Sequence, residues 1–216
     1  MGFRDRAHAG RELADRLHPY AGRENLLILG LPRGGVPVAF EVARELEAPL
    51  DVFVVRKLGL PGQEELAIGA IASGGVRVLN DEVVGALNVD EETIAQVAAA
   101  EGAELERRER LYRGERAPAE LRRRTVILVD DGLATGATMR AAARAVRAQE
   151  PERLVVAVPL AAKDACERVR ADADEVVCLQ TPDPFAAIGL WYEDFAPTSN
   201  EQVRELLHRS EVALAP

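Results

Sequence analysis

Five short apolar runs divide the chain into a repeating pattern. The first four are nearly continuous in Val, Leu, Ile and Phe, without the alternation typical of a strand with one face in water. Such runs predict strands that are covered on both faces, as in a parallel sheet. They are NLLILG (25–30), LDVFVVR (50–56), TVILVD (125–130), RLVVAVPL (153–160) and EVVCL (175–179).

Between most of these runs the apolar residues recur with helical spacing. This spacing predicts helices over 36–47, 138–149 and about 163–172. Strands that alternate with helices indicate an α/β domain of three layers, in which helices flank a mostly parallel, twisted sheet.

The interval from 57 to 124 breaks this alternation. Two strand-like pieces flank Ser73-Gly74-Gly75, which predicts a hairpin. One long helix is expected next, because acids at 90–92 and arginines near 107–110 suit the two ends of a helix dipole. Its apolar stripe is thin, which favours a surface or subunit-contact helix. We treat residues about 80–124 as a helical insertion.

A single domain is expected over residues 1–216. The length and the 48% hydrophobic content suit one core, which we place at about 23–180. The two ends, 1–20 and 181–216, would form a small hood. Within the tail, Ser199 and Gln202 make a capping-box pattern that predicts a terminal docking helix.

Charge and cysteine content narrow the class of protein. The net charge of −9 does not favour binding to nucleic acid or to anionic membranes. The amino-terminal segment lacks the apolar stretch of a secretory signal, and no uncharged run reaches membrane-spanning length. Cys166 and Cys178 lack metal-ligand spacing, so we expect reduced thiols in a soluble, cytoplasmic protein.

The third apolar run ends in two acids and enters a loop of small residues, VDDGLATGAT (129–138). A strand, a small-residue turn and a helix start form an anion cradle, because helix amides and the positive dipole end favour phosphate. No lysine follows the glycine as it does in a P-loop, which suits a terminal monophosphate. If that group is a sugar 5′-phosphate, Asp130 and Asp131 can accept hydrogen bonds from the ribose hydroxyls.

Residues 126–138, VILVDDGLATGAT, resemble the phosphoribosyl-pyrophosphate (PRPP) signature of the type I phosphoribosyltransferases. The other interpretation, an ordinary turn with a polar cap, does not require paired acids and Thr-Gly at these spacings. The resemblance implies the fold of that family and a PRPP site. The implied PRPP-binding residues are Gly34, Gly35, Asp130, Asp131, Leu133, Ala134, Thr135, Gly136, Ala137 and Thr138.

Two earlier segments also resemble parts of this family. GLPRGGVPVA (30–39) is similar to the pyrophosphate-binding loop, in which a non-proline cis peptide would precede Arg33. VVRKLGLPGQEELAIGAI (54–71) is similar to the Arg-Lys pair and mobile catalytic loop. The alternative for the first segment is an ordinary Gly-rich turn before a helix. The alternative for the second is a basic pair that is simply solvated. The resemblance implies Arg33, Arg56, Lys57 and Glu65 as catalytic residues, with Glu64 as a second candidate for the loop acid.

The segment DPFAAIGLWYEDF (183–195) resembles the hood that binds the base in purine-type members. Phe185, Trp191 or Tyr192 would stack on the base, and Asp194 would accept a hydrogen bond from the edge of the base. In the alternative interpretation, the same aromatic cluster packs against the tail helix. Ala134 stands where hypoxanthine-guanine enzymes carry an acid, which disfavours that class. The Ser-Tyr pair of the adenine-specific loop is also absent.

The resemblance as a whole implies a transferase that moves ribose 5-phosphate from PRPP to a nitrogenous base, purine-like by preference, and releases pyrophosphate. It implies Mg²⁺ as cofactor, held near Asp130 and Asp131 directly or through water, and a homodimer. The alternative is a PRPP-binding regulatory or sensor module without turnover.

Overall fold

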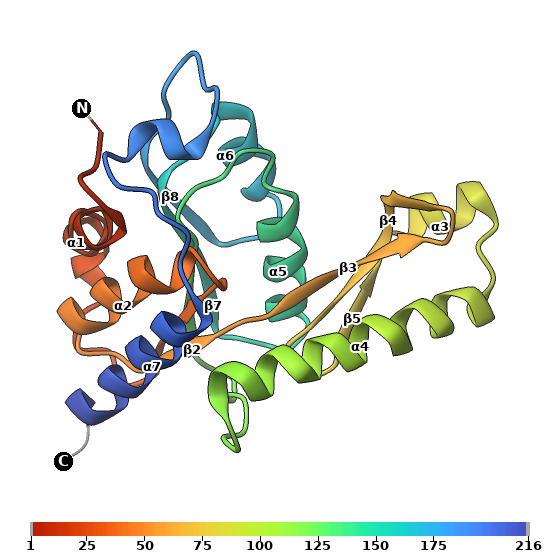
Figure 1. The fold of residues 1–216 in the computed structure, drawn as a ribbon, viewed down its shortest axis with the longest axis horizontal. Coiled ribbons are helices and arrows are strands. Elements are labelled where there is room, and N and C mark those ends of the chain that lie inside the picture. Colours follow the sequence, from red (N-terminus) through yellow and green to blue (C-terminus); the bar gives the residue numbers. More distant parts are fainter. Residues whose placement is uncertain (1, 215–216) are drawn as a thin grey trace.

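The computed structural model describes residues 2–214, and its core is a five-stranded parallel sheet with the strand order β2-β1-β6-β7-β8 (Figure 1). Every apolar run contributes a strand to this sheet, which confirms the predicted α/β class. The strands are β1 (Leu26–Gly30), β2 (Leu50–Val52), β6 (Thr125–Val129), β7 (Arg153–Leu160) and β8 (Glu175–Gln180).

Helices cover both faces of this sheet, so the predicted three layers are confirmed. Alternate residues of each strand enter different cores: Ile28 and Ile127 pack with one helix layer, whereas Leu27 and Val126 pack with the other. The first layer comprises α1 (Arg6–Leu17), α2 (Gly35–Glu45) and α7 (Asn200–Leu214); the second comprises α5 (Ala137–Arg147) and α6 (Lys163–Val169). A short 3-10 helix, η1 (His18–Tyr20), follows α1.

An antiparallel arm extends from the edge of the sheet at β2 (Figure 1). It comprises β3 (Val55–Leu60), β4 (Gln63–Ala72), β5 (Val76–Leu79), α3 (Asp81–Leu87) and α4 (Glu91–Arg113). The predicted hairpin at 73–75 is confirmed, and so is the long helix, which Asp90 caps by accepting from the Thr93 amide at 2.7 Å. The strand-like piece before Ser73 is β4, but the expected mobile loop around Gly59 and Pro61 is wrong, because β3 and β4 pair up to a tight turn there.

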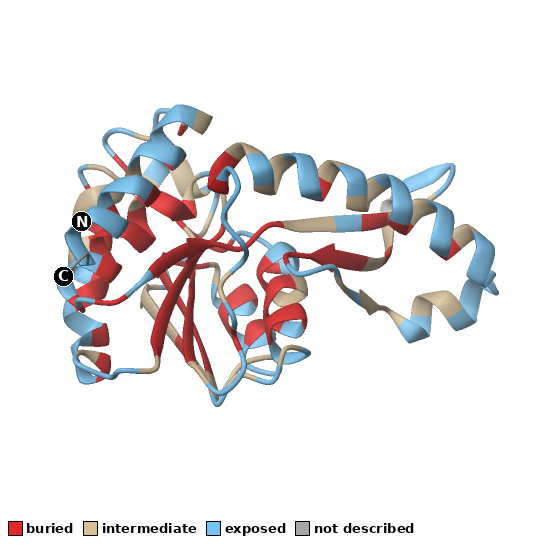
Figure 2. Ribbon diagram, turned by 90° about the horizontal axis from the view of Figure 1, so that it is seen from below, coloured by how far each residue is buried: buried red, intermediate tan, exposed pale blue. Residues whose placement is uncertain are grey.

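The long helix α4 is less peripheral than its thin apolar stripe suggested. Ile94, Ala98 and Leu105 are buried in the same core as α2 and α7. At its end, Arg113 is buried and binds Asp51 of the edge strand at 2.8 Å and Glu109 at 2.6 Å. This ion-pair cluster fixes the base of the arm to the sheet, while the far end of the arm is largely exposed (Figure 2).

Two further expectations have clear outcomes. The capping box is confirmed, since the Ser199 hydroxyl accepts from the Gln202 amide at 3.1 Å and the Gln202 side chain accepts from the Ser199 amide at 2.8 Å. The expectation of reduced thiols is wrong, because Cys166 and Cys178 form a disulfide. The spacing in the sequence did not reveal that α6 packs its cysteine against β8.

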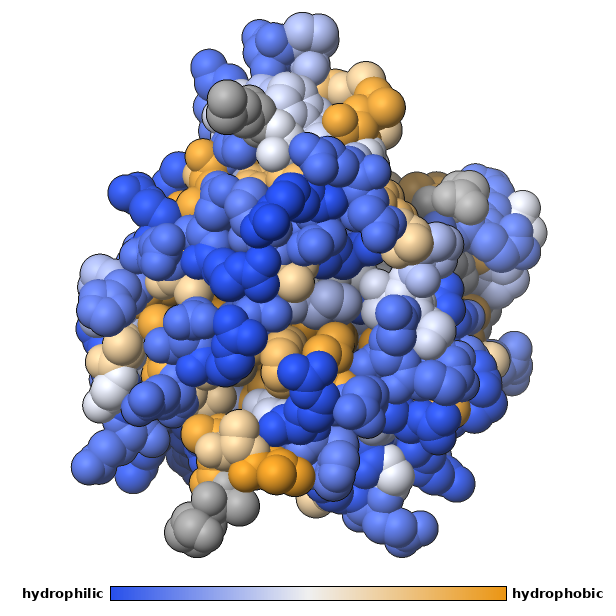
Figure 3. Space-filling view, turned by 60° about the vertical axis from the view of Figure 1, so that its left-hand side comes forward, coloured by the Kyte–Doolittle hydropathy of each residue, from blue (hydrophilic) through white to orange (hydrophobic). Residues whose placement is uncertain are grey.

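The outer face of the α1, α2 and α7 layer is mainly hydrophilic, with several separate hydrophobic patches (Figure 3). Within residues 2–214, no helix combines the length and the apolar character needed to cross a bilayer.

Candidate active site

Two loops meet where β1 and β6 end side by side in the sheet. Gly30 pairs with Val129 in the parallel register, and the Leu31 amide donates to the Val129 carbonyl at 2.9 Å. Each strand is followed by a loop and then by a helix, α2 after β1 and α5 after β6. Because both helix starts face the same sheet edge, ligands are expected in the crevice outside these strand ends.

The adjacent acids Asp130 and Asp131 lie at the centre of this edge. The Asp130 carboxylate accepts from the Asp131 amide at 2.9 Å. Burial and the neighbouring Asp131 charge raise the pKa of Asp130 well above its usual value. Burial also raises the pKa of Asp131, although a hydrogen bond from Arg6 opposes this effect. Two carboxylates that resist ionisation together favour a cation or a hydroxyl donor beside them.

The pyrophosphate-type loop packs directly on these acids, at a distance that only glycine allows. A Cβ atom on Gly34 would lie 2.0 Å from Asp131 Oδ2, and one on Gly35 would lie 2.7 Å from the Val129 carbonyl oxygen. The peptide bond between Pro32 and Arg33 is cis, as the resemblance implied. The structure therefore brings Gly34, Gly35, Asp130 and Asp131 together.

Residues 133–138, which the sequence predicted as a phosphate cradle, form a loop that leads into α5 (Ala137–Arg147). Leu133 is anchored by hydrogen bonds of 2.9 Å to Leu160 and Ala162, and Gly136 begins α5 with a φ of 76°. Ala134, Thr135, Ala137 and Thr138 are exposed to solvent. The first-turn amides of α5 have no partner within the helix, so the exposed loop presents donors to an anion.

Arg6, at the start of α1, is a site residue that the sequence did not reveal. Its Nε lies 2.8 Å from Asp131 Oδ2, and both side chains are almost buried, at 12% and 13% exposure. A second nitrogen donates to the Ala196 carbonyl at 2.8 Å, and the guanidinium lies 3.9 Å from the centre of the Phe195 ring. The chain separation of 125 residues explains why no local pattern pointed to this contact.

In the hood segment, Tyr192 is buried and contacts Asp131, so its ring does not present a face for stacking. Tyr192 is 6% exposed and packs against Phe3 and Phe195, with ring centroids 5.5 and 5.0 Å away. Its hydroxyl donates to the Asp131 carbonyl at 2.7 Å. A buried ring cannot stack on a base without rearrangement, so Tyr192 positions Asp131 in this conformation.

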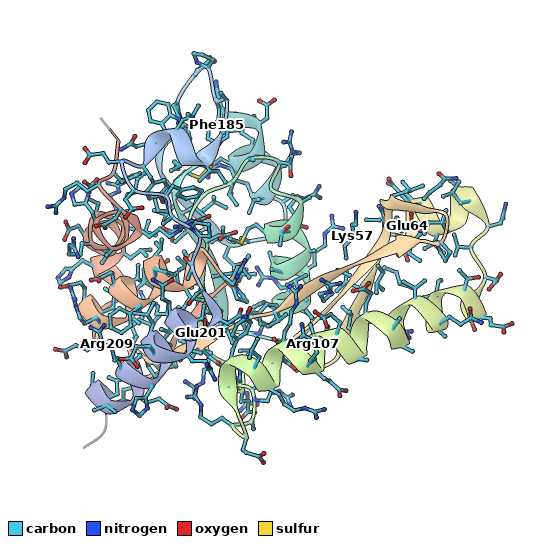
Figure 4. The ribbon with its side chains drawn as sticks, viewed as in Figure 1. Lys57, Glu64, Arg107, Phe185, Glu201 and Arg209 are labelled. Carbon is cyan, nitrogen blue, oxygen red and sulfur yellow. A yellow bond between two sulfur atoms is a disulfide. The ribbon has the colours of Figure 1, made fainter. Side chains whose placement is uncertain are left out.

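The other three predicted base-binding residues lie around this cluster. Phe185 is half-buried on the loop above the sheet edge (Figure 4). Trp191 is also half-buried, and its carbonyl accepts from the Phe3 amide at 2.7 Å. Asp194 is exposed, and its carboxylate accepts from the Ala196 amide at 2.9 Å. The exposed parts of Phe185, Trp191 and Asp194 remain candidates for base contact.

The predicted cations come from two different places. Arg33 is exposed on the loop after β1. Arg56 and Lys57 lie on β3 of the arm, where Arg56 binds Glu101 of α4 at 2.6 Å; Figure 4 shows Lys57 on the same strand. Glu65 lies in β4, but its side chain falls outside the described part of the structure. Arg33 therefore lies on the loop that packs against the acids, whereas Arg56 and Lys57 lie on a separate element, the arm.

The carboxylates of Asp130 and Asp131 suit a metal ion whose remaining ligands come from a bound substrate. Among the side chains that the structure describes, no three from His, Cys, Asp or Glu cluster as a metal site. Asp130 and Asp131 supply only carboxylate oxygens, which Mg²⁺ prefers, and Mg²⁺ in proteins commonly takes one or two carboxylates with phosphates of the substrate. These described residues therefore form no all-protein metal site.

Comparisons with known proteins bear on the family and the fold of the chain. Two Mycobacterium tuberculosis proteins, from strains CDC 1551 and H37Rv, are each 50% identical over 208 residues, and their names assign them provisionally to the phosphoribosyl transferases. The chain spans about half the length of these relatives, 47% of each. The crystal structure of TT1426 from Thermus thermophilus is similar with a TM-score of 0.87 and 47% identity, over 97% of this chain and 99% of that one.

The phosphoribosyl transferase domain family matches residues 4–194. This range includes the strands, both loops and most of the hood, and it includes Arg6 as well as the two acids. The chain therefore belongs to the phosphoribosyl transferase family.

Proposed function

We propose that this protein transfers ribose 5-phosphate from PRPP to a nitrogenous base and releases pyrophosphate. The observation that carries the proposal is the meeting of the glycine pair 34–35, the acid pair 130–131 and the 133–138 cradle at one sheet edge. PRPP is a sugar with a phosphate at one end and a diphosphate at the other. The 133–138 loop would face the phosphate, the acid pair the sugar hydroxyls, and the glycine pair the diphosphate.

Each part of the site has a separate role in this reaction. The exposed loop and the α5 amides would hold the 5′-phosphate, which fixes the sugar. Asp130 and Asp131 would accept hydrogen bonds from the ribose hydroxyls. When the bond to the leaving group lengthens, positive charge develops on the sugar, and the nearby carboxylates stabilise it electrostatically.

Mg²⁺ would bind between the PRPP oxygens and the side of the sheet edge that carries Asp130 and Asp131. When bound, the ion would neutralise charge on the diphosphate and so make it a better leaving group. Arg6 holds Asp131 in place, and the absence of a side chain at Gly34 and Gly35 lets the loop backbone approach the acids closely.

The departing pyrophosphate would be met by cations from two elements, the loop after β1 and the strand β3. Arg33 is on the loop that packs against the acids, whereas Arg56 and Lys57 are at the base of the arm. We propose that the arm approaches the site when substrate is bound, because closure excludes water and brings these cations near the leaving group. Glu65, the candidate catalytic acid of this segment, would move together with the arm.

The acceptor is proposed as purine-like, with contacts from Phe185, Trp191 and Asp194, while Tyr192 supports the site from behind. A use in nucleotide salvage would follow from such an acceptor. We further propose a homodimer and a cytoplasmic location, although the disulfide removes the cysteine argument for a reducing compartment.

The test is pyrophosphate release from PRPP in the presence of Mg²⁺, against a panel of purines, pyrimidines and other amines. Release that depends on one acceptor supports the proposal. A variant with Asp130→Asn and Asp131→Asn should lose this release, and Arg16→Ala, an exposed change on α1, should retain it.

The same preparation distinguishes the alternative of a sensor module. Tight PRPP binding by calorimetry, with no release for any acceptor, would favour a PRPP-binding module without turnover. If wild-type protein and the double asparagine variant both fail to bind PRPP, the proposed site is wrong.

A further inference from the structure

The helix α6 lies directly against the 133–138 loop that would hold the 5′-phosphate. The Ala162 amide, one residue before α6, donates to the Leu133 carbonyl at 2.9 Å. At Gly136, a Cβ atom would lie 3.4 Å from the Ala165 carbonyl oxygen in the first turn of α6, which is van der Waals contact. The loop backbone therefore rests on α6 near both of its ends.

Side chains also join α6 to the loop and to α5. Arg168 of α6 donates to the Thr135 carbonyl at 3.2 Å. Asp172, which follows α6, binds Arg140 and Arg144 of α5 at 2.8 Å each. The helix itself packs against α5 and β8 (Figure 1). A shift of α6 would therefore move the loop and the start of α5 together.

One covalent bond holds α6 on the sheet. Cys166 of α6 and Cys178 of β8 form the disulfide, and β8 is an edge strand of the five-stranded sheet. The other buried residues of α6 are Ala165 and Val169, whose small side chains remove little apolar area from water. A helix of seven residues is also too short to be stable by itself. The position of α6 thus depends strongly on the disulfide.

The disulfide lies where a reductant can reach it. Cys166 is 5% exposed, but Cys178 is half-buried on the edge strand. A thiolate of a dithiol reductant would attack Cys178 Sγ and release the Cys166 thiolate; the second reductant thiol would then displace Cys178 and complete the reductant's own disulfide. The two cysteines together gain two electrons and two protons, which the dithiol loses. In a reducing compartment, disulfides that form are usually transient or redox-sensing.

We propose that the Cys166–Cys178 disulfide is a redox-sensitive clamp on the 133–138 loop. In the oxidised protein the bond fixes α6 against β8 and so keeps the loop amides arranged for a phosphate. In the reduced protein α6 keeps only its noncovalent contacts, so the loop must be ordered when the phosphate binds. The inference rests on the proposed function for the identity of the ligand, PRPP, whereas the coupling between disulfide and loop does not depend on turnover.

The first test is hydrogen exchange of the full chain, followed by mass spectrometry, with and without dithiothreitol. Reduction should speed exchange in peptides that cover 133–138 and 163–169, because local opening becomes easier there. Peptides from β1, 26–30, are the internal control and should exchange at the same rate in both states. The variant Cys166→Ser plus Cys178→Ser should exchange as the reduced wild type does, and dithiothreitol should not change its exchange.

The second test is calorimetric titration of PRPP with Mg²⁺ into the oxidised and the reduced protein. We expect reduction to lower the affinity by about three- to tenfold, because ordering of the loop then opposes binding. Removal of dithiothreitol and reoxidation should restore the affinity, which separates the clamp from irreversible damage. In the double serine variant, dithiothreitol should leave the affinity unchanged.

Three results would overturn the proposal. Protein prepared without reductant titrates with both cysteines as free thiols, reduction leaves the exchange of the loop unchanged, or PRPP binds equally tightly in both states. Failure of the proposed function gives a different result. If PRPP binds in neither state while reduction still speeds exchange of the loop, the transfer reaction is refuted and the clamp stands.

Discussion

Replacing Arg6 by alanine removes the cation that the structure places on Asp131. Three interactions are lost: the 2.8 Å contact with the carboxylate, the 2.8 Å bond to the Ala196 carbonyl and the ring contact with Phe195. Breaking a buried pair by removal of one partner costs about 3–5 kcal/mol. Because Arg6 and Asp131 remain 12% and 13% exposed, we expect the lower end, about 3 kcal/mol.

This loss should be visible in thermal unfolding at neutral pH. A loss of about 3 kcal/mol lowers Tm by roughly 6–12 °C in a domain of this size. Arg6→Lys keeps the charge but not the fork that reaches both Asp131 and Ala196, so its deficit should be intermediate. Arg16→Ala, on an exposed position of the same helix, is the matched control and should change Tm little.

The Arg6→Ala deficit should also depend on pH. Burial raises the pKa of Asp131 above its unfolded value of about 3.9, so the folded protein holds this proton more tightly. That contribution to stability is fully present below the unfolded pKa and is lost as pH rises through the folded pKa. Loss of Arg6 raises the folded pKa further, so the deficit should be larger at pH 8 than at pH 5. Equal Tm values for Arg6→Ala and Arg16→Ala at both pH values would refute this reasoning.

Three other changes test neighbouring parts of the account. Gly34→Ala places a Cβ atom 2.0 Å from Asp131 Oδ2, so calorimetry should show loss of PRPP binding, with circular dichroism as the check on folding. Tyr192→Phe removes the bond to the Asp131 carbonyl and should cost about 1 kcal/mol in a urea titration; an unchanged midpoint would contradict the contact. Arg113→Ala should cost about 3–5 kcal/mol, because Arg113 is 3% exposed and its loss leaves Asp51 unpaired; unfolding at the wild-type midpoint would show that the anchor of the arm is unimportant.

Local patterns in the sequence predicted the parts of the fold that depend on neighbouring residues. The parallel strands follow from apolar runs, α4 from its charged ends, and the capping box from Ser199 and Gln202. The order of strand, acids, loop and helix start around 126–138 could be predicted because these features are contiguous in the sequence. Gly34 and Gly35 were singled out by resemblance as pyrophosphate-binding residues, but their packing on the acids was not predicted, because it joins two segments far apart in the chain.

Contacts between distant segments could not be predicted in the same way. Arg6 and Asp131 are 125 residues apart, and a lone arginine near the amino terminus gives no sign of a buried partner. Tyr192 looked equally suited to stacking and to packing, and only its neighbours Phe3 and Phe195 show that it is buried. The segment 54–71 contains Gly and Pro residues typical of a loop, yet pairing between β3 and β4 orders it as a ribbon.

The central claim is that the sheet edge at Asp130 and Asp131 binds PRPP for transfer. The most direct measurement is calorimetric binding of PRPP with Mg²⁺, followed by pyrophosphate release against the acceptor panel, for wild type and the double asparagine variant. The account predicts PRPP binding and acceptor-dependent release by the wild type, and loss of both in a variant that remains folded. PRPP binding and release that are unchanged when both acids become asparagine would contradict it.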